Sequence, residues 1–381
     1  MKTSPRFEDI LSPDNLRLAW HKVSLGRSSK KPILDFHIRL DENLAALSRD
    51  LADGSYRPGP LETFVIKDPK ERVISAAGVR DRVAFHAVMN VYDPVFDRHL
   101  IHDSYACRMG KGTHKAVLRA FHFAKSSRFF LIMDVRKYFY SIDHAVLKEM
   151  LARLVRDGRT LDLFRVIVDS SHAMPGKGVP IGNLTSQYFA NHYLSPLDHR
   201  FKERLRVRRY LRYMDDILIF GNDLDELKGL YLEAVSHAGE KLGLALKPQV
   251  VGTVAEGAPF LGFLVRNSGI YLQQKTKRRY RARIAELERK LGRGTMGELE
   301  AGRRAESLTS HLLLARSRAF RDTVLYGRVV GIEPRSSRRK LEQFGGERAF
   351  RVSEQQRPIQ PEQQQRLPSC PPQPDCSGFC R

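Results

Sequence analysis

The chain has 381 residues, and 65 Lys and Arg against 43 Asp and Glu give a formal net charge of +22 at pH 7. Hydrophobic residues make up 42% of the chain and charged residues 28%, a balance that supports a packed core and excludes wholesale disorder. No apolar run approaches the roughly 20 residues that span a bilayer, and the first residues lack a signal-peptide core. We therefore expect a cytoplasmic protein without membrane contact, whose positive charge indicates a polyanionic partner such as nucleic acid.

The first hundred residues combine helices with one hairpin. Apolar residues at three- and four-residue steps predict helices within 7–55, the second beginning at an Asp41 N-cap and ending at Gly54. From Pro58 the pattern changes to two short strand-like runs around a turn at 68–70. A β-hairpin over 62–75 follows from that spacing. Residues 78–98 return to helical spacing.

Three apolar runs dominate the middle of the chain, and each meets an acidic residue. Residues 129–133 end at Asp134, and residues 209–213 run through Met214 into Asp215 and Asp216. A third run, 217–220, leaves that acidic pair. All three are predicted to be buried strands. Beyond them the pattern predicts a helix from Leu224 and short strands at 244–246 and 260–264.

The C-terminal part changes in composition. A basic run over 275–283 opens a predicted helix, and a second helix is expected over 304–326. Beyond 333 the chain is rich in Pro, Gln and Arg, which predicts a disordered tail. Three of the four cysteines, Cys370, Cys376 and Cys380, lie in this tail with no His among them, so a metal site there is the less favoured interpretation. Four cysteines are too few for a disulfide scaffold, which indicates a reducing compartment.

Carboxylates at strand ends are the strongest chemical signal. A carboxylate beside buried strands is costly unless it is paired or binds a cation. If the fold brings Asp134 to Asp215 and Asp216, their oxygens suit Mg²⁺, which accepts few carboxylates and leaves room for substrate phosphates. Two such ions could activate a hydroxyl and stabilise departing pyrophosphate. An Asp-Asp pair is also common in plain hairpin turns, but the flanking apolar strands and Asp134 favour the metal site.

Four motifs resemble those of reverse transcriptases, in the same order and over about residues 7–325. Tyr213-Met214-Asp215-Asp216 resembles the family signature, and the stretch from Asp134 to Asp143 resembles the first palm motif. The stretch 178–187 resembles the motif between them, and 260–263 is similar to the primer-grip region. The resemblance implies an α+β right-hand polymerase fold with fingers, an antiparallel-sheet palm and a helical thumb.

The expected domains follow from this resemblance. Residues 1–125 would form N-terminal helices and fingers, and 126–270 the palm, with a finger–palm insert around 150–190. Residues 271–332 would form the helical thumb, and 333–381 the tail.

The resemblance also implies roles for individual residues. Asp134, Asp215 and Asp216 would be the catalytic metal ligands for two Mg²⁺ ions, with Mn²⁺ as a substitute. The substrate-binding residues implied by the resemblance are Lys67, Arg72, Phe139, Ile181, Gly182 and Gln187. Within this set, the two basic residues would hold the nucleotide triphosphate, although an exposed hairpin also carries such residues merely as solvated surface.

Three further positions carry particular expectations. Phe139, five residues after Asp134, would exclude a ribose 2′-hydroxyl, although Tyr138 is an adjacent candidate and core packing is the alternative. Gly182 would allow close backbone approach. Lys247 follows the predicted strand at 244–246 out of register with the lysine that similar enzymes often carry there, so we leave it out of the catalytic set.

The middle motif resembles that of one particular subgroup of reverse transcriptases. Ile181-Gly182 followed by Ser186-Gln187 is similar to the reverse transcriptases of bacterial diversity-generating retroelements, as is the stretch 104–114. That group copies a template RNA into cDNA with errors at adenines, for mutagenic retrohoming. A polar side chain at position 181 would discriminate geometry better than Ile does.

The leading hypothesis is thus an RNA-directed DNA polymerase. The resemblance implies an RNA template, a DNA or RNA primer and dNTPs as partners, with a small basic accessory protein by analogy to the retroelement group. Two alternatives stay open: a group II intron or other bacterial retroelement reverse transcriptase, and a catalytically silent nucleic-acid-binding scaffold.

Overall fold

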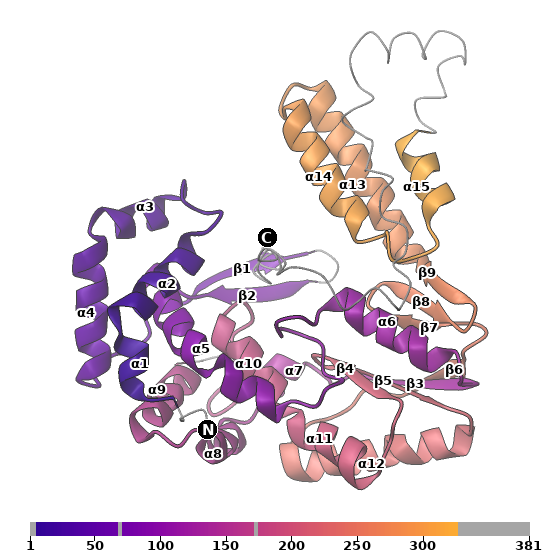
Figure 1. Cartoon of the computed structure of the whole chain (residues 1–381), viewed down its shortest axis with the longest axis horizontal. Coiled ribbons are helices and arrows are strands. Elements are labelled where there is room, and N and C mark those ends of the chain that lie inside the picture. Colours follow the sequence, from indigo (N-terminus) through magenta and orange to yellow (C-terminus); the bar gives the residue numbers. More distant parts are fainter. Residues whose placement is uncertain (1–4, 68–70, 171–173, 327–381) are drawn as a thin grey trace, which may run out of the picture. The chain divides into compact units, whose positions relative to one another are not determined.

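The computed structural model describes residues 5–67, 71–170 and 174–326. Two compact units make up this part of the chain (Figure 1). Among the described residues, unit 1 contains those up to Ala116 together with Phe129–Val251, and unit 2 contains Val117–Arg128 together with Gly252–Tyr326. Within the described residues no helix is both long enough and apolar enough to cross a bilayer.

Helices and one hairpin form the N-terminal part of unit 1. The helices are α1 (Phe7–Leu11), α2 (Pro13–Ser24), α3 (Lys31–Ile38), α4 (Leu40–Ala52) and α5 (Val79–His99), and the antiparallel hairpin pairs β1 (Glu62–Ile66) with β2 (Arg72–Ala76). Ser12 begins α2 by accepting a hydrogen bond from the backbone N–H of Asn15, as an N-cap serine does. The predicted hairpin and the helix over 78–98 are confirmed, while its turn at 68–70 lies outside the described residues.

A four-stranded sheet lies at the centre of the predicted palm. Its strands, in the order β4-β5-β3-β6, are β4 (Tyr210–Tyr213), β5 (Asp216–Gly221), β3 (Phe129–Met133) and β6 (Val250–Thr253). β3 and β4 both pair antiparallel to β5, with Met133 opposite Ile217. The three predicted buried strands are therefore neighbours, as their nearly continuous apolar sequences suggest.

The helices between Thr113 and Leu242 lie before and between the strands of this sheet in the chain. They are α6 (Thr113–Ala124), α7 (Tyr138–Ser141), α8 (His144–Leu154), α9 (Gly158–Asp169), α10 (Leu184–Tyr193), α11 (Ser195–His199), the π-helix η1 (Arg200–Arg204) and α12 (Leu224–Leu242). α12 packs against β3 and β5, and α10 packs against α5 and α8 (Figure 1). The apolar face predicted from Leu224 onward is what α12 buries, through Leu227, Ala234 and Ala238.

Unit 2 contains a small sheet followed by helices. An antiparallel meander of β7 (Ala258–Phe260), β8 (Phe263–Arg266) and β9 (Gly269–Leu272) precedes α13 (Gln274–Gly292), α14 (Glu298–Ser310) and α15 (Arg318–Leu325). Leu261 and Gly262, at φ +48° and +87°, form the tight turn between β7 and β8. Two left-handed residues match the right-handed twist of a two-residue hairpin loop.

The α+β prediction with antiparallel sheets is confirmed, but four local predictions are wrong. The single strand expected at 260–264 is the β7–β8 hairpin, whose turn lies at Leu261 and Gly262. Residues 244–246 form no strand, because only Leu246 makes an isolated bridge, to Val135. The helix expected over 304–326 is two helices, α14 and α15, separated by a loop around Ser317. Asp41 lies in the first turn of α4 and Arg39 holds the N-cap position, so the carboxylate acts on the helix dipole instead of capping.

Aromatic side chains from α5, α9 and α10 pack together in the core of unit 1. The Phe164 side chain is fully buried, and its ring centroid lies 5.6 Å from that of Tyr92, 5.9 Å from that of Phe96 and 5.6 Å from that of Phe189. Edge-to-face pairs of this kind add stability beyond the area they bury.

We expect Phe164→Ala to reduce the free energy of unfolding by about 3–5 kcal/mol, because it opens a cavity at the meeting point of three rings. Urea unfolding followed by circular dichroism measures the loss. Leu232→Ala, at a side chain that is 67% exposed on α12, is the matched control and should change stability little. Equal losses for both variants would contradict the packing analysis.

Candidate active site

The hairpin between β4 and β5 presents the acidic pair. Tyr213 pairs with Asp216 across it, and Met214 takes a left-handed conformation at φ +55°. A non-glycine residue with positive φ is uncommon and costs local backbone energy. The turn is therefore held by contacts beyond its own sequence, while the buried strands on either side fix where the carboxylates emerge.

Asp134 joins this hairpin from the end of β3. Because Met133 lies opposite Ile217, the next residue along β3 comes level with the beginning of β5. Asp134 Oδ2 accepts a hydrogen bond from Lys247 Nζ at 2.5 Å, and the Asp134 carbonyl accepts one from the Lys247 backbone N–H at 2.8 Å. Its other oxygen, Oδ1, is buried and has no hydrogen-bond partner among the described residues. A buried carboxylate oxygen in that state is suited to a cation.

The pKa of Asp215 is affected by the charge of Asp134. Burial raises its pKa above the usual range, and the negative charge of Asp134 raises it further. The positive charges of Lys247 and Arg72 act in the opposite direction. Like charges brought together in a partly desolvated place favour protonation or a bound cation. The carboxylates of Asp134 and Asp215 therefore form one electrostatic unit, although they are about eighty residues apart in the chain.

The site is not a complete metal cage built by the chain alone. In the part of the chain that the structure describes, no three His, Cys, Asp or Glu side chains gather into a group able to hold an ion. Mg²⁺ commonly takes one or two carboxylates and completes its shell with water and substrate phosphates. The unpaired Oδ1 of Asp134 beside Asp215 fits that type of site. Asp216 lies at the start of β5 next to them.

The two basic candidates stand on the β1–β2 hairpin. Lys67 follows β1 and is exposed, and Arg72 begins β2 opposite Ile66. Arg72 is close enough to Asp215 for its charge to lower the pKa of that carboxyl. Arg72 thus contributes to the electrostatics of the acidic site, whereas Lys67 is placed only by the strand it follows.

Gly182 lies where the middle motif, residues 178–187, packs against the β1–β2 hairpin. Its φ is +122°, and a Cβ at this position would lie 2.8 Å from Cγ2 of Ile74 in β2, a distance that real Cβ contacts do not reach. The Ile181 carbonyl accepts a hydrogen bond from the Ser75 N–H at 2.8 Å. Asn183, the residue after Gly182, accepts a hydrogen bond at its Oδ1 from the Ala77 N–H at 3.0 Å. The backbone at Gly182 therefore lies close to β2, and Ile181 is held through its carbonyl.

The two aromatic candidates near Asp134 occupy different environments. Tyr138 is buried, and its hydroxyl donates to the Ala190 carbonyl inside the fold. Phe139 is half-buried and packs edge-on against the Tyr138 ring at 5.8 Å. Only Phe139 of these two has surface left for a ligand.

Gln187 lies on α10 and faces a loop of unit 1. Its Oε1 accepts a hydrogen bond from Sγ of Cys107 at 3.2 Å. The sequence pattern predicted Gln187 as a substrate-binding residue, and the contact that the structure adds is a structural one to the 101–112 loop.

Sequence reasoning left out Lys247, which the structure brings to Asp134. The omission arose because the residues before it look like a strand whose register cannot be read from the chain. In the fold, the Val135–Leu246 bridge sets the register instead and carries Lys247 to the carboxylate. The signal was present as a Lys-Pro pair closing an apolar run.

Comparison with known protein families identifies one segment. Residues 66–265, just over half of the chain, match a family model described as "Reverse transcriptase (RNA-dependent DNA polymerase)". This segment contains every candidate site residue and Lys247.

Relatives are distant and longer than the matched part. The chain is 25% identical over 179 residues to Protein YkfC of Escherichia coli (strain K12), covering 44% of this chain and 47% of that protein. It is 24% identical over 215 residues to the Group II intron-encoded protein LtrA of Lactococcus lactis subsp. cremoris, covering 52% of this chain and 35% of that protein. The chain thus spans less than half the length of these relatives. Among solved structures, telomerase from Candida albicans, in complex with a TWJ fragment of telomeric RNA, aligns over 69% of this chain and 58% of that chain, with a TM-score of 0.42 and 11% identity.

The raised pKa of Asp215 predicts a dependence of stability on pH in the metal-free protein. Its protonated form is favoured by folding, so this contribution is present below the unfolded pKa and is lost as pH rises through the folded pKa. In EDTA at about pH 7, Asp215→Asn should therefore melt at a higher temperature than the wild type, and the gain should shrink towards about pH 3.

Thermal unfolding across this pH range tests the prediction. Asp225→Asn, at an 88% exposed side chain on α12, makes the same chemical change away from the site and is the control. A gain for Asp215→Asn that does not vary with pH would contradict the assignment.

Proposed function

Because the chain belongs to the reverse transcriptase family, we propose that it is an RNA-directed DNA polymerase that extends a primer on an RNA template. Its fold class is the α+β right-hand polymerase fold predicted from the sequence. One observation carries the proposal: Asp134, just after β3, and Asp215, in the β4–β5 turn, share one electrostatic environment, and Asp134 has a buried oxygen without a hydrogen-bond partner among the described residues.

Two Mg²⁺ ions are the proposed cofactors. Asp134 and Asp215 would hold them, and Asp216 would complete the acidic site. When bound, Mg²⁺ supplies activation of the primer 3′-hydroxyl and charge neutralisation on the departing pyrophosphate. Lys247 donates to Asp134 Oδ2 at 2.5 Å and so orients that carboxylate. Oδ1 has no hydrogen-bond partner among the described residues and would be the oxygen that binds metal.

The incoming nucleotide would be bound between the hairpin and the first palm motif. Lys67 and Arg72 supply the positive charge for its triphosphate, and a guanidinium binds phosphate through two parallel hydrogen bonds. The half-buried Phe139 is proposed to exclude a ribose 2′-hydroxyl, since Tyr138 is committed to the core. Ile181 and Gly182 would line the pocket near the base and sugar, with Gln187 supporting this region from α10.

Template and primer would follow the basic surface of unit 2. Within α13, Tyr280 and Ile284 are buried, while Lys275, Arg278 and Arg281 are exposed on the remaining surface. A helix with one apolar face packed and its basic residues in water is suited to phosphate contacts. Binding through such contacts weakens steeply with salt.

We further propose that the enzyme belongs to a diversity-generating retroelement, copies its template with errors at adenines for mutagenic retrohoming, and works with a small basic accessory protein. The apolar Ile181 before Gly182 supports this subgroup. The likeness to LtrA, a group II intron-encoded protein, favours the alternative of an intron reverse transcriptase. Two near-identical repeats in the neighbouring DNA, differing at adenine positions, would decide for the retroelement.

We expect Asp215→Asn to lower Mg²⁺-dependent extension of a DNA primer on an RNA template by about a thousandfold or more, because a metal's charge stabilisation contributes several kcal/mol. Primer extension with purified protein gives the rate. Asp225→Asn on exposed α12 should extend as the wild type does. Equal extension by wild type and Asp215→Asn would refute the site, and a wild type that binds nucleic acid without extending it would indicate a silent scaffold.

Ile181→Gln should reduce misincorporation opposite template adenine severalfold, because a hydrogen-bonding side chain discriminates geometry better than an apolar one. Sequencing of cDNA from a defined RNA template measures the error spectrum. Ile181→Leu keeps the pocket apolar and should leave the spectrum near that of the wild type. If the Gln variant also keeps its adenine errors, position 181 does not set fidelity.

A further inference from the structure

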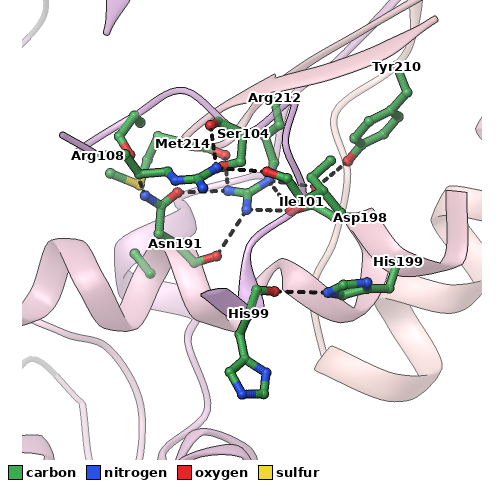
Figure 2. Close-up of polar contacts among 12 residues, drawn as sticks. His99, Ile101, Ser104, Arg108, Asn191, Asp198, His199, Tyr210, Arg212 and Met214 are labelled. Atoms are coloured by element: carbon green, nitrogen blue, oxygen red, sulfur yellow. Dashed lines mark hydrogen bonds and ion pairs between the residues drawn. The ribbon is translucent and has the colours of Figure 1, made fainter. Parts of the chain in front are cut away.

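Arg212, two residues before Met214 of the acidic hairpin, is completely buried. Figure 2 shows its polar contacts with Asp198, Asn191 and Met214. Its guanidinium meets the equally buried carboxylate of Asp198 from α11, with Nη2–Oδ2 at 2.6 Å and Nε–Oδ1 at 2.8 Å. Tyr210, two residues earlier in β4 and so on the same face, donates its hydroxyl to Asp198 Oδ1 at 2.6 Å. The carboxylate is thus bonded on both oxygens, as a buried charge requires.

The remaining N–H groups of Arg212 reach two other parts of the fold. Nη1 donates to the Met214 carbonyl at 2.8 Å and to Asn191 Oδ1 at 3.0 Å, and Nη2 donates to the Asn191 carbonyl at 3.0 Å. A guanidinium has five N–H donors in a rigid fork, and every one of them is engaged here. The guanidinium of Arg212 therefore has one orientation, fixed by Asn191 of α10 and Asp198 of α11. In that orientation its Nη1 donates to the carbonyl of Met214 in the turn.

The backbone of Arg212 is held as firmly as its side chain. Its N–H donates to the Asp103 carbonyl, and its carbonyl accepts from the Tyr105 N–H, both at 2.9 Å. Asn191 also donates from Nδ2 to the Ala106 carbonyl at 2.6 Å. The loop that carries residues 103–106 thus fixes β4 from one side while α10 and α11 fix it from the other.

This arrangement explains how Met214 keeps its left-handed backbone. A positive φ at a non-glycine residue costs on the order of 1 kcal/mol or more. A charge-assisted hydrogen bond to its carbonyl is among the stronger ones available. Stability alone would not require ions here, because well-packed apolar residues often replace a buried ion pair without loss.

We propose that Arg212, oriented by Asp198 and Asn191, is a positioning residue that fixes the Met214 carbonyl and thereby places the Asp215 carboxylate against Asp134. The proposal rests on the proposed function and deepens it. Arg212 is fully buried and does not touch substrate, so its effect reaches the reaction only through the turn. Loss of the contact should disturb metal binding and the chemical step more than nucleotide binding.

Arg212→Lys is the central variant, since it keeps a positive charge for Asp198 but has no fork to reach Met214. We expect kcat to fall by about 10- to 100-fold, the effect of losing one hydrogen bond from a charged donor. The Mg²⁺ concentration for half-maximal extension should rise, with the KM for dNTP changed little. Unchanged kcat and Mg²⁺ response would overturn the proposal.

Tyr56→Phe is the matched control. It removes one buried hydrogen bond to a charged group, from the Tyr56 hydroxyl to Asp81 Oδ1 at 2.9 Å, and within the described part of the chain neither residue hydrogen-bonds to Arg212 or to the 103–106 loop. It should lower the melting temperature as Arg212→Lys does, but leave the Mg²⁺ response within about twofold of the wild type. An equal shift in Mg²⁺ response for both variants would mean that general loosening is the cause, and would overturn the proposal.

A second variant covers the case in which Arg212→Lys does not fold. Arg212→Met, Asp198→Leu and Tyr210→Phe together replace the buried charges and their hydroxyl partner by apolar groups, a change that folded proteins tolerate. The proposal expects a folded protein with a weakened Mg²⁺ response, and a wild-type response would overturn it. Failure of the proposed function is distinguishable, because the wild type itself would then not extend a primer.

Discussion

Burying a guanidinium and a carboxylate together costs several kcal/mol per ion in desolvation before any attraction is counted. The chain makes this arrangement once at full depth within the described residues, between Arg212 and Asp198, which are both 0% exposed. Helices α10 and α11, strand β4 and the 103–106 loop all contribute partners to it. The pair is therefore the point where separately folded segments are brought into register, and the acidic hairpin is the element that follows directly from it.

The acidic site itself shows a balance of opposing charges. Asp134 and Asp215 raise each other's energy, and Lys247 and Arg72 offset part of that repulsion. Lys247 comes from the segment after α12 and Arg72 from the β1–β2 hairpin, so the compensation depends on the completed fold and not on neighbours in sequence. The two positive charges offset the repulsion between the carboxylates only in part. Full pairing of both carboxylates would leave no oxygen for a cation.

The sequence was sufficient for β3, β4 and β5 and for the acidic residues beside them, because buried strands are nearly continuous apolar runs and a carboxylate that interrupts one is conspicuous. It was insufficient where side chains meet across the fold. Arg212 reads as one polar residue in a strand and Asp198 as one acidic residue in a short helix, and nothing local links them. Lys247 was missed for the same reason, since its place depends on a single bridge at Leu246 and not on a regular strand. The contact of Gly182 with Ile74 could not be read from the sequence either, since these residues are far apart in the chain.

The bonds from β2 to the middle motif have a consequence for how the protein behaves in concentrated solution. Phe64, Val65 and Val73 leave much of their apolar surface in water on a two-stranded ribbon, and open strand edges recruit other chains. The N–H groups of Ser75 in β2 and of Ala77 just after it donate to the Ile181 carbonyl and to Asn183 Oδ1, so that edge of the ribbon is closed to a foreign strand. Strand addition by a second copy is thereby directed to β1, and mutations that shield the β1 edge are the ones to choose for a more soluble preparation.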